Sequence, residues 1–151
     1  MSTIEGTEAH AFSLPASGGR TVSSAALSGK PYVLYFYPKA DTSGCTKEAQ
    51  AFQALLGSFR QKGVEVIGVS RDPVKALDKF AAKYGLEFPL ASDDEGKLTT
   101  AYGVWVEKSM YGRKYMGIER STVLVGADGK VVKAWPKVKI DGHAEDVLSS
   151  V

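Results

Sequence analysis

The run from Pro31 to Tyr37, PYVLYFY, constrains the fold of this chain more than any other segment. It is continuously apolar and aromatic, without the alternation that marks a strand with one face in water. Such a run is typical of a strand that is buried on both faces of a sheet. Pro38 ends it, because proline has no N–H to donate to a sheet ladder. The segment is therefore expected inside a sheet whose two faces are both covered.

Strand and helix patterns alternate along the rest of the chain. Apolar side chains recur with the spacing of a helix face between residues 49 and 59 and again after Pro73. The alternation, followed by a hairpin signal at Asp128-Gly129, predicts an α/β fold in a single domain of residues 1–151, with a central mixed sheet flanked by helices on both faces. The expected elements are a hairpin or lead-in strand within 12–22, strands at 31–37 and 64–69, helices at 49–59, 74–84 and 93–102, a short extended piece at 88–90, a hairpin at 122–135 and a helix at 141–151.

The composition excludes several classes of function. A chain of 151 residues with one cysteine has no intramolecular disulfide, no CxxC pair and no cysteine-rich zinc site. The absence of Asn removes a Cys-His-Asn triad. A net charge of +2 is too small to predict binding to nucleic acid or to a membrane surface. No apolar run approaches the ~20 residues of a membrane span, and the N-terminus lacks a signal pattern. The expectation is a cytoplasmic protein of a reducing compartment.

The one cysteine, Cys45, lies between the buried strand and the first amphipathic helix. If Thr42 or Asp41 is the N-cap, Cys45 falls in the first turn of that helix. Free backbone N–H groups and the helix dipole stabilise negative charge there, which favours a reactive thiolate. A free cysteine is also common as an inert, buried side chain. Position alone therefore leaves the reactive and the inert interpretations open.

The spacing around Cys45 is more informative than its position. Pro38, Thr42 and Cys45 fit the pattern Pro-x3-Thr-x2-Cys, which resembles the peroxidatic-site signature of peroxiredoxins. From residue 10 onward the chain resembles the bacterioferritin-comigratory protein, or peroxiredoxin Q, subfamily. The resemblance implies a thioredoxin-like fold, a mostly monomeric protein, and reduction of hydrogen peroxide and organic hydroperoxides without metal, haem or another cofactor. The strings that carry it are YPKADTSGCTKEA, GVSRD, FPLASD, GIERSTVLV and WPKVKIDGHAEDVL.

The resemblance also implies a role for each residue of the site. The Cys45 thiolate would attack one peroxide oxygen and become sulfenic acid. Arg120 would favour the thiolate and hold the peroxide, and Thr42 would place its hydroxyl beside the peroxide. Pro38 would shield the thiolate from water, and Glu48 would orient Arg120. Simpler interpretations stay open: a strand end for Pro38, an N-cap for Thr42 and an exposed helix carboxylate for Glu48.

The chain departs from the subfamily at the positions of the resolving cysteine. Many relatives reduce the sulfenic acid with a second cysteine, and the matching positions here are Gln50 and Ala81. The expectation is therefore an external thiol reductant: thioredoxin, glutaredoxin or glutathione. A natural one-cysteine protein and an engineered variant that has lost a cysteine at Ala81 both remain open. A redox-sensing chaperone or binding protein on the same fold is the alternative function, whereas a disulfide oxidoreductase is disfavoured because it needs a dithiol.

Other conspicuous residues receive no catalytic role. Tyr37 and Trp135 are expected to be packing residues. His10 and His143 are expected at the surface. A cationic group between the helices and the last hairpin is expected to lie in a solvated loop; it comprises Lys108, Arg113 and Lys114.

Overall fold

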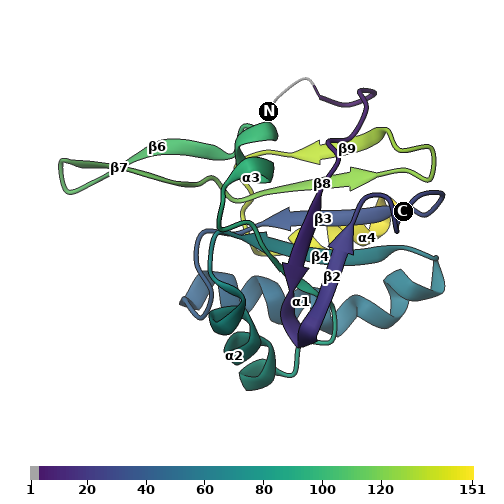
Figure 1. Cartoon of the computed structure of the whole chain (residues 1–151), viewed down its shortest axis with the longest axis horizontal. Helices are drawn as coiled ribbons and strands as arrows, with labels where there is room; N and C mark the ends of the chain where they lie inside the picture. Colours follow the sequence, from purple (N-terminus) through teal and green to yellow (C-terminus); the bar gives the residue numbers. More distant parts are fainter. Residues whose placement is uncertain (1–3) are drawn as a thin grey trace.

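Seven strands form one mixed sheet, and two more form a separate ribbon (Figure 1). The computed structural model describes residues 4–151. The strand order in the large sheet is β2-β1-β5-β4-β3-β8-β9. The strands are β1 (Ser13–Ala16), β2 (Arg20–Ser23), β3 (Tyr32–Phe36), β4 (Glu65–Ser70), β5 (Leu90–Ser92), β6 (Trp105–Met110), β7 (Arg113–Ile118), β8 (Ser121–Val125) and β9 (Val131–Trp135). The helices are α1 (Ser43–Gln61), α2 (Val74–Tyr84), α3 (Lys97–Ala101) and α4 (His143–Ser149), with a 3-10 turn, η1 (Ser17–Gly19).

Strand β3 lies inside the sheet and is buried along its whole length, as its sequence predicts. It runs parallel to β4 and antiparallel to β8. Because side chains alternate across a strand, Val33 and Tyr35 enter a hydrophobic cluster with α1, α2 and α4. Leu34 and Phe36 enter a second cluster, to which α3 contributes. The predicted α/β architecture, a mixed sheet with helices on both faces, is confirmed.

Helix α3 is shorter than its sequence predicts. A helix was expected over 93–102, but it begins only at Lys97. The buried carboxylate of Asp93 accepts hydrogen bonds from the backbone N–H groups of Leu98 and Thr99, so Asp93 satisfies the start of the helix from outside it. The last helix is also shorter than predicted at both ends. Helix α1 (Ser43–Gln61) extends beyond the expected range of 49–59 at both ends, and the remaining expected helices and strands form within two residues of their predicted positions.

The expectation of a solvated loop at Lys108, Arg113 and Lys114 is wrong. These residues lie on β6 and β7, which pair as an antiparallel ribbon that extends away from the body of the molecule (Figure 1). Its turn is Tyr111-Gly112, with positive φ at both residues (51° and 77°), as a two-residue hairpin turn requires. Most of the ribbon is exposed, so it lacks the apolar alternation by which a strand is recognised in sequence.

The expectation that His143 lies at the surface is also wrong, whereas His10 is exposed as expected. His143 is buried at the start of α4, where its Nε2 forms a 2.7 Å hydrogen bond with the hydroxyl of Thr122. The rings of Phe52 and Trp135 contact the imidazole edge to face. Burial lowers the pKa of His143 to about 4; the charge of Asp146 acts to raise it and that of Arg120 to lower it. The imidazole is therefore neutral in the folded protein at neutral pH.

Replacing His143 by Gln is expected to flatten the dependence of stability on pH. Because the pKa of His143 falls from 6.5 to about 4 on folding, the unfolded chain binds more protons in this window. The contribution of the neutral imidazole is therefore complete above pH 6.5 and is lost as the pH falls towards 4. The slope removed is at most about 1.4 kcal/mol per pH unit, the value for one proton. Urea unfolding at several pH values measures it. The matched control is His10→Gln, and an equal flattening there would contradict the assignment.

Candidate active site

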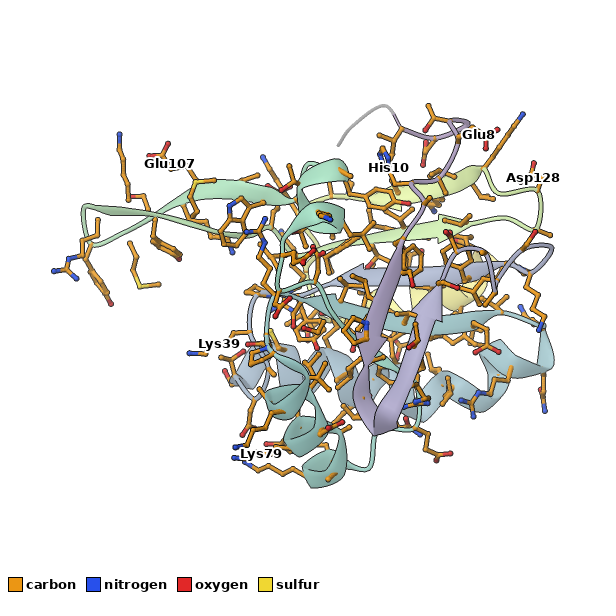
Figure 2. All side chains as sticks on the ribbon, in the orientation of Figure 1. Glu8, His10, Lys39, Lys79, Glu107 and Asp128 are labelled. Atoms are coloured by element: carbon orange, nitrogen blue, oxygen red, sulfur yellow. The ribbon has the colours of Figure 1, made fainter. Side chains whose placement is uncertain are left out.

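Helix α1 places Cys45 where the sequence predicts it. Thr42 is the N-cap, with extended backbone, and Cys45 lies in the first turn, almost completely buried. The Thr42 hydroxyl does not cap the helix but donates a 2.8 Å hydrogen bond to the carbonyl of Lys39. This bond uses its proton and leaves the oxygen lone pairs free to accept. Lys39, marked in Figure 2, therefore belongs to the same closed loop as Thr42.

Arg120 joins the cysteine to a carboxylate. It follows β7, and its Nη2 lies 3.3 Å from the Cys45 sulfur while its Nη1 donates to Glu48 Oε1 at 2.6 Å. A Cβ on the neighbouring Gly44 would stand 3.4 Å from Arg120 Nη2, an ordinary contact, and 3.2 Å from the side chain of Ile140, a tight one. One guanidinium thus contacts both acidic groups of the site.

Glu48 is buried on the inner face of α1, so its interpretation as an exposed helix carboxylate is wrong. Burial raises the pKa of Glu48 to about 7, although the charge and hydrogen bond of Arg120 act to lower it. Its second oxygen, Oε2, has no hydrogen-bond partner among residues 4–151. Glu48 therefore changes charge near neutral pH beside the cation that contacts Cys45.

The loop from Pro38 to Thr42 is held by residues to which the sequence assigned no role. The Asp72 carboxylate accepts hydrogen bonds from the Ala40 backbone N–H and from the Ser70 hydroxyl, both at 2.8 Å. Pro38 itself is exposed at the beginning of this loop. Asp72 ends the string GVSRD, which served above only to support the resemblance. The string GVSRD indicated that Asp72 belongs to the family pattern, but it did not show that Asp72 would contact the loop at Ala40.

A second tie connects the same loop to α2. Asp41 has a positive φ of 62°, and its carboxylate binds the Lys83 ammonium at 3.0 Å and the Tyr84 hydroxyl at 2.8 Å. Both partners lie in the last turn of α2, close in sequence to Ala81, which is partly buried against the core. Gln50, the other position matched to a resolving cysteine, is exposed on α1. The loop before Cys45 is thus fixed from two directions.

Tyr37 and Trp135 pack as predicted. Tyr37 is fully buried in the cluster that contains Cys45, and burial raises the pKa of its hydroxyl well above the usual range. Trp135 is partly buried against the same cluster, and its Nε1 donates to Asp146 at 2.9 Å. Neither side chain forms a hydrogen bond with Cys45, so both support the shape of the core around it.

Comparison with known proteins assigns the chain to a family. The family model "AhpC/TSA family" matches residues 6–134. The chain belongs to this family, as a peroxiredoxin of the Bcp/PrxQ type. It is 46% identical to the putative peroxiredoxin bcp of Coxiella burnetii over 98% of both chains, and 43% identical to peroxiredoxin Bcp of Bacillus subtilis over 99% of this chain and 96% of that one. A structure of Xanthomonas campestris peroxiredoxin Q superposes with a TM-score of 0.88 at 49% identity, covering 92% of this chain and 88% of that one.

Membership of the peroxiredoxins makes the protein a thiol-dependent peroxidase on a thioredoxin-like fold. Its one cysteine sets it apart from the Xanthomonas peroxiredoxin. Two structures of that protein carry serine in place of two different cysteines. Those cysteines lie as far apart in that sequence as Cys45 and Ala81 do here. Ala81 therefore matches the second of them in spacing but carries no sulfur.

Replacing Asp72 by Ala is expected to slow the reaction of Cys45 with peroxide. The change leaves the Ala40 N–H without its acceptor, which costs about 1–3 kcal/mol and releases the loop that positions Thr42 and the start of α1. The measurement combines urea unfolding with stopped-flow oxidation of the folded protein. Asp78→Ala is the matched control, because Asp78 also accepts a backbone hydrogen bond, from Gly18, but away from Cys45. Equal oxidation rates for the two variants would contradict the positioning role of Asp72.

Proposed function

We propose that this peroxiredoxin reduces hydrogen peroxide and organic hydroperoxides at Cys45 and is regenerated by the thiol of another molecule. The observation that carries the proposal is the 3.3 Å contact between Arg120 Nη2 and the Cys45 sulfur in the first turn of α1. A guanidinium and the free N–H groups of a helix start both favour a thiolate over a thiol.

The chemical step needs one nucleophile, and hydrogen-bond donors for the negative charge that develops on the departing oxygen. The Cys45 thiolate attacks one peroxide oxygen, a sulfur–oxygen bond forms and the O–O bond breaks. The sulfur becomes sulfenic acid, and the departing oxygen takes a proton and leaves as water or an alcohol. Negative charge grows on that oxygen in the transition state. The Arg120 guanidinium stands ready to stabilise it without reorganisation, which is the most effective form of such stabilisation.

The neighbouring residues act by positioning. Thr42 offers the lone pairs of a hydroxyl whose proton is already committed to Lys39, so it can accept the peroxide O–H. Glu48 holds one side of the guanidinium and leaves the other side directed at the sulfur. Pro38 borders the loop and limits the access of water. These three roles match those that the family resemblance implies.

The range of peroxides is supported by one relative. A structure of the Xanthomonas campestris bacterioferritin comigratory protein is described as giving insight into its alkyl peroxide reduction, and this chain is 48% identical to it. Cys45 attacks the O–O bond, which hydrogen peroxide and alkyl hydroperoxides share. We therefore include both as substrates.

Regeneration requires sulfur from outside the chain, because the sequence contains one cysteine. A first thiol condenses with the sulfenic acid to give a mixed disulfide and water, and a second thiol releases Cys45 and leaves a disulfide on the reductant. Thioredoxin, glutaredoxin and glutathione supply this chemistry.

We also propose that the protein is a monomer in the cytoplasm. Within residues 4–151, no helix has the length and apolarity needed to cross a bilayer.

Replacing Arg120 by Ala is expected to lower the rate constant for oxidation by hydrogen peroxide about 100-fold, the usual cost of one preorganised donor to a developing charge. Stopped-flow fluorescence on the reduced protein measures this rate. Cys45→Ser is the control and must abolish the reaction. An Arg120→Ala rate equal to that of the wild type would remove Arg120 from the mechanism. Wild-type oxidation no faster than that of free cysteine would overturn the proposed function.

Excess peroxide without a reducing thiol is expected to oxidise Cys45 further. No second cysteine can trap the sulfenic acid, so sulfinic and sulfonic acids accumulate. Intact mass after peroxide treatment should rise by about 32 and 48 Da, the masses of two and three oxygen atoms. Prior addition of dithiothreitol should suppress both products. A mass that stays at the sulfenic acid, or does not change, would contradict this expectation.

A further inference from the structure

The β6–β7 ribbon carries large apolar side chains that the fold does not use. Met110, Tyr111, Tyr115 and Met116 are between 44% and 98% exposed, and they account for all but one of the exposed large hydrophobic residues that the structure describes. The ribbon extends into solvent, so nothing in residues 4–151 covers it (Figure 1). Exposed aromatic and methionine side chains gathered in one place are typical of a protein-binding surface.

Tyr111 is the clearest sign that this surface has a function. It stands at the tip of the ribbon with a φ of 51°, in the left-handed region that bulky residues avoid, and it is 98% exposed. Asn or Gly would fit this turn without strain. No packing within the described chain offsets the strain of a tyrosine here. An unfavourable backbone conformation that brings no structural gain points to a role outside the fold.

The two faces of the ribbon differ in charge. Cross-strand partners share a face, so Lys108 and Tyr115 lie on the same face as Met110 and Arg113; we name it the Lys108 face. The opposite face, the Glu107 face, holds Glu107, Ser109, Lys114 and Met116. There Lys114 pairs with Glu107 at 3.9 Å. On the Lys108 face, in the described part of the chain, no carboxylate comes within ion-pair distance of either cation. This face is therefore apolar and positive.

The base of the Lys108 face lies close in sequence to Arg120. The methylenes of Lys108 lie over Gly117, only a short stretch of chain before Arg120. Burial lowers the pKa of Lys108 and the charge of Arg120 lowers it further, whereas Cys45 and the Glu119 carboxylate act in the opposite direction. Figure 2 shows Glu107 pointing away from the side of the molecule on which Lys39, of the Cys45 loop, lies.

We propose that the Lys108 face, together with Tyr111, is the docking surface for the protein thiol that reduces oxidised Cys45, and that this partner presents an acidic surface around its reactive cysteine. The inference rests on the proposed function, because the external thiol is needed only if Cys45 is oxidised in the cycle. An apolar centre of methionine and tyrosine with arginine beside it is the composition of an energetic hot spot. The positive charge selects an acidic partner and speeds its approach.

The test compares protein and small-molecule reductants on the same oxidised protein. An acidic thioredoxin and an acidic glutaredoxin, each kept reduced by its own system, are the protein probes, and dithiothreitol is the small one. The quantity measured is the ratio of the protein-thiol rate constant to the dithiothreitol rate constant. Because dithiothreitol needs no docking surface, the ratio removes any general damage to the site.

Matched variants on the two faces distinguish docking from a general effect. Met110→Ser is compared with Met116→Ser, since both methionines are about half exposed, and Arg113→Glu is compared with Lys114→Glu. The ratio is expected to fall about tenfold for the variants on the Lys108 face and to change little for those on the Glu107 face. Tyr111→Asn should lower the ratio without lowering the free energy of unfolding, because asparagine tolerates the turn. Added salt should lower the wild-type ratio.

Equal effects on both faces, or none, would overturn the proposal, as would a wild-type protein that neither protein probe reduces faster than dithiothreitol. A wild-type dimer in sedimentation that Met110→Ser dissociates would assign the surface to a second copy of the chain and overturn it too. Each of these results leaves the peroxide reaction of Cys45 intact in stopped flow. Loss of that reaction would instead count against the proposed function.

Discussion

The site depends on one guanidinium that serves two buried acids. Arg120 contacts the Cys45 sulfur and the Glu48 carboxylate, and a lone charge buried at any of these positions would cost several kcal/mol. The cluster has one positive charge for two acidic groups, and burial raises the pKa of Glu48 to about 7. Near neutral pH the Glu48 carboxyl can therefore hold a proton, and the charge of Arg120 is then not balanced by Glu48.

Sheet topology brings these groups together from distant parts of the sequence. β3 and β8 are antiparallel neighbours, and their register sets Phe36 opposite Ser121. The residue before β8, Arg120, therefore emerges beside the end of β3, where the loop to α1 begins. That loop delivers Cys45 in the first turn of the helix, and Asp72, just beyond the neighbouring strand β4, holds the loop in place. Because β4 runs parallel to β3 and β8 runs antiparallel to it, the ends of β3 and β4 and the start of β8 lie at the same edge of the sheet.

The sequence predicted those parts of the fold that depend on neighbouring residues. A buried strand followed by an amphipathic helix is readable from neighbouring residues, and so was a helix start at Asp41 or Thr42, which places Cys45 in the first turn. The spacing of Glu48 put it on the face of Cys45 but could not show that this face is buried. The burial of His143 depends on partners on other elements, which no local pattern reveals. The β6–β7 ribbon was missed for the opposite reason. Most of its side chains are exposed, so its sequence does not show the alternation of apolar and polar residues that identifies a strand.

Two different segments lie beside the Cys45 loop: α2, which carries Ala81 in place of a cysteine, and the segment from the ribbon to Arg120. The hydrogen bonds from Lys83 and Tyr84 to Asp41 tie the loop before Cys45 to α2, the helix that carries Ala81. With alanine at position 81, α2 offers no sulfur to the sulfenic acid of Cys45. Catalysis therefore does not require the hydrogen bonds between Asp41 and α2 to break. The exposed apolar residues and the cations of the ribbon lie on the segment that leads to Arg120, so a partner docked there as proposed and α2 would contact the site through different elements.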